Sequence, residues 1–244
     1  MTWKFLALCL LVAAGGCAWT PDRLDALLPT DALLLGEQHD AALHQQRHRQ
    51  VVVSLAARGA LAAVAIEMAE QGASTEALPR DASESAVREA LKWNEPGWPW
   101  AAYGPVVMAA VRSGVPVLGA NLPRAQMRAA MGDAQLDSLL DPLALAAQRE
   151  AMRDGHCGLL PETQLGPMAR IQVARDRAMA RTVAGAVREG KVVVLVAGSG
   201  HVDALLGVPR HMARELRVRI IQWPSQPPKK DYCAELKKQM TPTM

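Results

Sequence analysis

Two distant segments of the chain share one pattern, an apolar run that ends in Gly-x-x-His. The first segment is residues 32–40 (ALLLGEQHD) and the second is residues 192–203 (VVVLVAGSGHVD). An apolar run bounded by glycine predicts a strand buried on both faces, with the histidine just beyond its end. In an open α/β sheet, ligands bind at the edge where the strands end. The repeated pattern, with Glu37 close to His39, therefore predicts a site built from two halves.

The rest of the chain favours an α/β fold in which helices flank a mostly parallel central sheet. Half of the 244 residues are hydrophobic but only 4% are aromatic, so Ala, Leu and Val must build the core of about one large domain. The intervening segments are long enough for the crossover helices that parallel strands need, and residues 40–58 form the first of these, opened by Asp40. We expect five strands, at residues 32–36, 61–67, 115–119, 191–197 and 217–222.

Between the third and fourth strands we expect a helical insertion of about residues 123–190. This stretch holds no convincing strand, and its apolar residues, Met179 and Val183 among them, follow helical spacing. Its length favours a lid or subdomain over a single crossover helix.

Residues 94–105 (NEPGWPWAAYGP) gather Trp98, Trp100 and Tyr103 in a chain that is poor in aromatic residues. The proline and glycine residues predict a loop, and a loop of that kind cannot bury so many rings by itself. We therefore expect this loop to lie over another part of the molecule.

The N-terminus indicates export. Lys4, an apolar stretch over residues 5–14 and Gly15-Gly16-Cys17 resemble a signal peptide of residues 1–16, and the apolar stretch is too short to span a bilayer. Cys17 is placed like the lipidated cysteine of a bacterial lipoprotein, and Ala18 after it favours the outer membrane. The alternative is an ordinary secretory signal that is cut elsewhere. We expect residues 17–30 to be a tether, 31–223 the domain and 224–244 a tail.

The cysteines support the same compartment. Cys9 would leave with the signal peptide and Cys17 would carry lipid, which leaves Cys157 and Cys233 as an even pair. In an oxidising compartment such a pair tends to form a disulfide, which would attach the C-terminal tail to the middle of the chain. The formal net charge of +3 is not gathered into a basic stripe, so nucleic acid is excluded as a partner.

Polar residues follow each of the first four expected strands. In parallel strands four of them, Glu37, His39, Glu67 and His201, would converge on one edge, and Asn121 and Asp203 follow strands in the same way. Two imidazoles and two carboxylates suit a divalent metal such as Zn²⁺, Mn²⁺ or Fe²⁺, or a general acid and base. The alternative is structural, with the carboxylates capping helices and the histidines acting as hydrogen-bond donors.

Other titratable residues have two interpretations each. His44 and His48 stand at i and i+4 on the expected first helix, a spacing that can hold a metal but more often marks an exposed surface. Tyr103 and Tyr232 can supply a tyrosinate to haem iron, or a hydroxyl that bonds to a buried group. Arg124 can hold a substrate carboxylate or a haem propionate, and Arg175, on the apolar side of a helix, requires an anionic partner.

Five motifs, in order, resemble the ChaN family of iron-regulated, haem-binding lipoproteins, part of the larger Tiki/TraB/erythromycin-esterase-like group. They are LLLGEQHD ending at Asp40, AIEM around Glu67, WPW followed by Tyr103, GANLPR ending at Arg124, and AGSGH ending at His201. The resemblance covers roughly residues 30–223.

The resemblance implies an α/β fold with helical additions and a periplasm-facing lipoprotein at the outer membrane. It also implies haem bound through a tyrosine, here Tyr103 rather than Tyr232, with two haems facing each other in a homodimer. Trp98 and Trp100 would then wall the haem, Arg124 would meet a propionate, and an outer-membrane receptor would exchange haem with the protein. Relatives in the wider group use residues matching Glu37, His39, Glu67 and His201 in a metal-dependent peptidase or esterase-like site, so a hydrolase is the alternative function.

Overall fold

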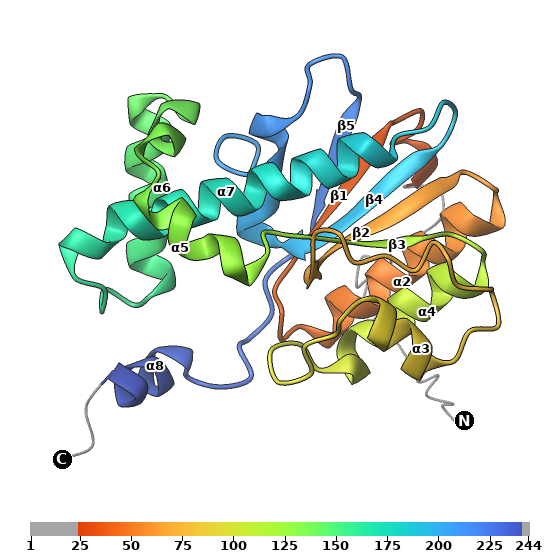
Figure 1. The fold of residues 1–244 in the computed structure, drawn as a ribbon, viewed down its shortest axis with the longest axis horizontal. Coiled ribbons are helices and arrows are strands. Elements are labelled where there is room, and N and C mark those ends of the chain that lie inside the picture. The colour runs from red at the N-terminus through yellow and green to blue at the C-terminus, as the bar shows by residue number, and fades with distance from the viewer. Residues whose placement is uncertain (1–23, 241–244) are drawn as a thin grey trace, which may run out of the picture.

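A five-stranded sheet forms the centre of the molecule in the computed structural model, which describes residues 24–240 (Figure 1). All of the strand pairings within it are parallel, and the spatial order is β3-β2-β4-β1-β5. The strands are β1 (Ala32–Glu37), β2 (Leu61–Glu70), β3 (Val117–Asn121), β4 (Val192–Gly198) and β5 (Val218–Gln222). The predicted fold class is confirmed, and each predicted strand overlaps an observed one.

Strand β4 is the central strand and brings the two Gly-x-x-His segments together. Its register aligns Glu37 at the end of β1 with Gly198 at its own end, and on its other side it pairs with β2. The chain leaves β1 and β2 toward one face of the sheet, whereas it returns to β4 along the other face. When the segments that connect adjacent parallel strands run to opposite faces of the sheet, a crevice forms at the carboxyl ends of those strands.

Helices cover both faces of the sheet (Figure 1). On one face, α2 (Ala42–Ala57) packs beside α4 (Trp100–Arg112), with α3 (Glu84–Ala90) next to α4. On the other face, α7 (Glu162–Ala186) crosses β2, β3 and β4. Side chains of β1 alternate between the two cores: Leu33 and Leu35 pack with α2 and α4, and Leu34 packs with α7. Burial on both faces explains why the strands read as continuous apolar runs.

The predicted helical insertion lies where it was expected, between β3 and β4. It consists of α5 (Arg124–Gly132), the 3-10 helix η1 (Ala134–Leu139), α6 (Pro142–Gly155) and α7. Its inner surface forms a separate small core in which Leu122 and Leu136 pack against Val173 of α7. After β4 come two further 3-10 helices, η2 (Ser199–Val202) and η3 (Val208–His211), and the described chain closes with α8 (Tyr232–Met240).

The prediction of a loop over residues 94–105 is wrong in its second half. The expected loop at 94–105 ends at Pro99, because α4 begins at Trp100 and continues through Pro105. The buried residues Val106, Val107 and Val111 make an apolar stripe on α4, and its burial outweighs the hydrogen bond that Pro105 cannot donate.

Asp40 does not open the first helix. The N-cap of α2 is Ala41, which makes no side-chain cap bond. Asp40 instead accepts hydrogen bonds from the side chain of Gln38, the backbone N–H of Lys229 and the hydroxyl of Tyr232. It therefore holds the C-terminal segment rather than a helix end.

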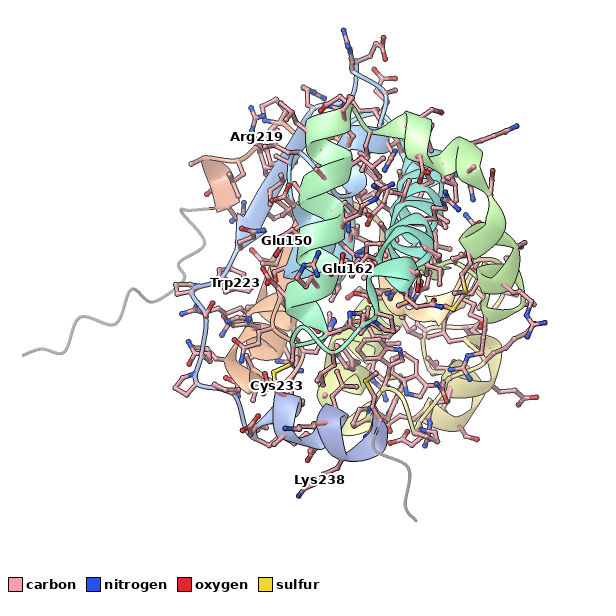
Figure 2. The ribbon with its side chains drawn as sticks, turned by 90° about the vertical axis from the view of Figure 1, so that its left-hand side faces the viewer. Glu150, Glu162, Arg219, Trp223, Cys233 and Lys238 are labelled. Atoms are coloured by element: carbon pink, nitrogen blue, oxygen red, sulfur yellow. A yellow bond between two sulfur atoms is a disulfide. The ribbon has the colours of Figure 1, made fainter. Side chains whose placement is uncertain are left out.

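The disulfide between Cys157 and Cys233 is present, so that prediction is confirmed. It attaches α8 to the residues that follow α6, and Figure 2 shows the bond beside Cys233 at the lower end of the molecule. At the other end of the described chain, Leu24 is fully buried and packs into the core beneath α2 and α4.

The proposed signal peptide and Cys17 lie outside the described residues. Within residues 24–240, no helix combines the length and the apolar character needed to cross a membrane.

Candidate functional site

Glu37 is a buried carboxylate at the end of β1, shared by three side chains. Its Oε1 accepts a 2.5 Å hydrogen bond from the Tyr103 hydroxyl and lies 2.8 Å from Nδ1 of His39. Its Oε2 lies 3.2 Å from Nδ1 of His48. Burial by itself would raise the pKa of Glu37, but the neighbouring His39 and His48 outweigh burial and hold it below its ordinary value. The carboxylate therefore stays charged and orients the ring of His39.

Glu67, near the end of β2, is the centre of a second set of buried side chains joined by hydrogen bonds. Its Oε1 accepts a 2.5 Å hydrogen bond from Arg175 of α7, and its Oε2 accepts one from the backbone N–H of Gly198. Arg175 also donates to the side chain of Asn121 at the end of β3, which in turn donates to the backbone carbonyl of Glu67. Glu67 is therefore the anionic partner that the sequence predicted for Arg175. Through these hydrogen bonds, Glu67 of β2 is linked to β3, β4 and α7.

His201 lies between two carboxylates. Its Nδ1 is 2.5 Å from Oδ1 of Asp176, and its Nε2 is 3.3 Å from Oε1 of Glu67. Burial opposes the charged ring, but the two anions raise the pKa of His201 to about 9. Burial also raises the pKa of Asp176, to about 6. At neutral pH His201 is an imidazolium, which stabilises Glu67 as an anion.

The four residues predicted to converge do so. His39 connects the two groups, because its Nε2 lies 3.9 Å from Oε2 of Glu67. Gly198 permits this approach: a Cβ on this glycine would come within 2.8 Å of Nε2 of His39. His39 is also the member of the four that reaches solvent, with 43% of its side chain exposed. The edge therefore presents a single accessible imidazole in front of buried, paired charges.

His44 and His48 are buried, so the prediction that they lie on an exposed surface is wrong. Nδ1 of His44 accepts from the backbone N–H of Gln38, and its Nε2 lies 3.1 Å from the carbonyl of Pro224. These partners fix a neutral ring, in agreement with the lowered pKa that burial gives it. His44 and His48 lie on the face of α2 that also carries Val51 and Leu55, which turns both imidazoles inward.

A pocket of about 830 Å³ opens in front of His39. Trp98 and Tyr103 form one side of it, with the ring of Trp98 edge-on to both His39 and Tyr103 at centroid distances of 4.9 and 5.7 Å. Lys229, Lys230 and Tyr232 come to it from the C-terminal segment. Aromatic walls with a few polar groups are typical of a site for a large organic ligand.

The two tyrosines differ in access. Tyr103 is buried in α4, and burial beside the charge of Glu37 raises its pKa far above the ordinary value. Tyr232 is 45% exposed, and its hydroxyl donates a 2.9 Å hydrogen bond to Asp40. Burial and the Asp40 carboxylate also raise the pKa of Tyr232.

Trp100 and Arg124 do not line this pocket. Trp100 is buried at the start of α4, where its indole N–H donates to Glu84 and its ring packs against Trp93. Arg124 lines a separate cavity of about 270 Å³ beside Trp98. Its backbone N–H donates to Glu70. The part assigned to these two residues in holding haem stays a prediction.

Comparison with known proteins adds a family. Residues 23–212 match the family described as haem-binding uptake, Tiki superfamily, ChaN. The chain belongs to this ChaN family. A solved structure of ChaN from Campylobacter jejuni, described by its cofacial haem binding, has a similar fold, with a TM-score of 0.71 and 24% sequence identity over 82% of this chain and 84% of that one. Among curated proteins, no significant match was found.

The part of this ChaN-family chain that the structure describes contains no group of three or more His, Cys, Asp or Glu side chains arranged to hold a metal ion. At the sheet edge, the positive charges of Arg175 and His201 already lie against Glu67, and a cation there would have to displace them. The divalent metal site at Glu37, His39, Glu67 and His201, and the hydrolase that would use it, stay predictions.

Asp176 was missed by sequence reasoning, although its position held a signal. It is a carboxylate on the same face of α7 as the buried residues Ala169, Val173 and Val183. A charge on an apolar face requires a buried partner, and His201 is that partner. Gln172, one turn earlier, places its side-chain amide 3.1 Å from Nδ1 of His201 and has no comparable sequence signal.

Proposed function

We propose that this protein binds haem in the pocket in front of His39 and assists haem uptake. The pocket itself carries the proposal: about 830 Å³ of space bordered by Trp98, Tyr103 and Tyr232, with two lysines at its margin. The aromatic rings suit the faces of a porphyrin, and the lysines suit its two propionates. Membership of a haem-binding uptake family supports the same ligand.

Tyr232 is the tyrosine that we propose as the iron ligand. The buried hydroxyl of Tyr103 donates a hydrogen bond to the charged carboxylate of Glu37. Ionising Tyr103 would therefore place two negative charges side by side. The hydroxyl of Tyr232 also donates to a carboxylate, that of Asp40, but this tyrosine is half-exposed beside the pocket and Nζ of Lys230 lies 5.1 Å from its ring centroid, so ferric iron could replace its proton. His39, with an exposed ring nitrogen, would border the haem, and Lys229 and Lys230 would bind the propionates. Bound haem supplies a redox-active iron centre and a strong visible spectrum.

A haemin titration of the chain lacking residues 1–17 tests this proposal. We expect saturable binding with a tyrosinate-type absorbance spectrum, which Tyr232→Phe abolishes and Tyr103→Phe leaves in place. If Tyr103→Phe removes that spectrum and Tyr232→Phe does not, the ligand is the buried tyrosine. If haemin does not bind saturably, haem binding in this pocket is excluded.

We further propose that the protein faces the periplasm, attached to the outer membrane by lipid at Cys17, where it exchanges haem with a membrane receptor. The signal-like N-terminus, the disulfide and the uptake description of the family support this location. Labelling with a radioactive fatty acid should modify the wild-type chain and not the Cys17→Ser variant. The variant should also leave the outer-membrane fraction, and its retention there would contradict a lipid anchor.

Haem bound in this open pocket would keep one face uncovered, so we propose that a second copy covers it in a homodimer. The cofacial haem binding described for the Campylobacter jejuni ChaN supports this arrangement. Light scattering coupled to size-exclusion chromatography should give a monomer mass without haemin and a dimer mass with it. An unchanged monomer mass at saturating haemin would contradict the dimer.

A further inference from the structure

The C-terminal segment of residues 223–233, here called the strap, supplies three of the pocket residues and is joined to the domain at its two ends. Figure 2 shows it running from Trp223 along one side of the molecule to α8. Lys229, Lys230 and Tyr232 all belong to it. The match to the ChaN family ends at residue 212, so this part of the pocket lies beyond the matched region.

Residues that follow β1 hold one end of the strap. The carbonyl of Pro224 lies 3.1 Å from Nε2 of His44, and the backbone N–H of Gln226 donates to Gln38. Farther along, Asp40 accepts from both Lys229 and Tyr232. His44 itself is buried. The hydrogen bonds from the strap to Asp40 are exposed, so water competes with the strap for the Asp40 carboxylate.

The disulfide holds the other end of the strap, beside Tyr232. Helix α8 has no buried residue, so it contributes little apolar packing that would hold Tyr232 in place. Cys233 adjoins Tyr232 directly and is covalently bonded to Cys157 at the end of α6. Cys233 is exposed and Cys157 is only partly buried, so a reductant can reach the bond. Exposed disulfides of this kind are the ones that take part in exchange or regulation.

We infer that the Cys157–Cys233 disulfide is a redox control of ligand binding: its reduction releases the strap, removes Tyr232 and both lysines from the pocket, and lets haem dissociate. This inference rests on the proposed haem site. The reductant is a dithiol, of the class that small molecules or thiol oxidoreductases supply. Its two thiols are oxidised to a disulfide, while Cys157 and Cys233 each take up a hydrogen and become thiols.

The test compares two forms of the full chain. One sample stays oxidised, and the other is reduced with dithiothreitol, alkylated with iodoacetamide and freed of both reagents before haemin is added, so that no thiol contacts the iron. We expect the reduced form to bind haemin at least ten-fold more weakly and to lack the tyrosinate spectrum. Faster amide hydrogen exchange over residues 224–240 in the reduced form should accompany this loss.

The double variant C157S/C233S is the matched control, because it lacks the disulfide and offers no thiol at either position to the alkylating reagent. This variant should bind haemin as weakly as the reduced wild type does, whether or not it has been treated with reductant. Tyr232→Phe in the oxidised state should also lose the tyrosinate spectrum. Equal affinity and equal spectra for the oxidised and reduced wild type would overturn the redox control and leave the haem site intact. Absence of binding to the oxidised form would instead overturn the proposed function, and the redox control of haem with it.

Discussion

The Tyr103 hydroxyl donates a 2.5 Å hydrogen bond to Oε1 of Glu37, and both residues are almost fully buried. A charged carboxylate in such a place depends on its donors. The pair links α4 to the end of β1, so it fixes the wall of the pocket relative to the sheet.

Tyr103→Phe should lower the free energy of unfolding by about 1–3 kcal/mol, because Glu37 loses a buried donor and nothing replaces it. Urea denaturation of the haem-free protein measures this difference. The control is Tyr232→Phe, which removes a hydroxyl from a half-exposed ring and should change stability by less than about 0.5 kcal/mol. If both variants change the free energy of unfolding equally, the buried hydrogen bond stabilises the protein no more than the exposed one does.

Arg175→Met should destabilise the protein by about 3 kcal/mol, since it leaves Glu67 buried with one cation fewer. Arg181→Met, at an exposed position on the same helix, should stay within about 0.5 kcal/mol of the wild type. Adding Glu67→Gln to Arg175→Met should recover part of the loss, because the uncompensated charge disappears. If the double variant is less stable than either single one, the attribution to charge is wrong.

Stability should fall as the pH rises toward 10. The folded-state pKa of His201 is raised to about 9, above its ordinary value near 6.5. Its contribution is therefore complete below pH 6.5 and is lost as the pH rises through 9, an effect of the order of 3 kcal/mol between the limits. Urea midpoints in the presence of a chelator, from pH 6 to pH 10, would reveal this slope, and His201→Gln should flatten it. A slope that is unchanged in the variant would assign it to other groups.

Gly207→Ala should cost about 1–3 kcal/mol, because its Cβ would come within 2.2 Å of the backbone carbonyl of His201. Gly200→Ala is the control, since open space surrounds that position. Thermal denaturation of both variants measures the difference. A tolerated Gly207→Ala would mean that the backbone after β4 can move without disturbing His201.

The purified protein, dialysed against Zn²⁺ or Mn²⁺, should retain less than one equivalent of metal at the sheet edge, because Arg175 and His201 already neutralise Glu67. Elemental analysis after gel filtration gives the stoichiometry. One equivalent that disappears in Glu37→Ala would reverse this expectation and favour the metal-dependent hydrolase.

The strands and the convergence of Glu37, His39, Glu67 and His201 could be predicted, because apolar runs that end in glycine report burial on both faces. The orientation of α2 could not be predicted while His44 and His48 were counted as polar. Their spacing to Val51 and Leu55 continues the apolar face of the helix, and the Pro224 carbonyl that meets His44 is close to it only in the folded chain. Likewise, α4 was obscured by Pro99 and Pro105, whose local preference is overridden by the burial of neighbouring valines.

The position of β4 has a consequence for biosynthesis. β1 and β2 do not pair with each other, and each depends on β4, whose residues are made much later. During synthesis β2 can pair only with β3, and β1 has no neighbouring strand, until residues 192–198 insert between β1 and β2. A nascent or truncated chain that stops before this strand has neither a closed sheet nor the edge at which His39 and Glu67 meet.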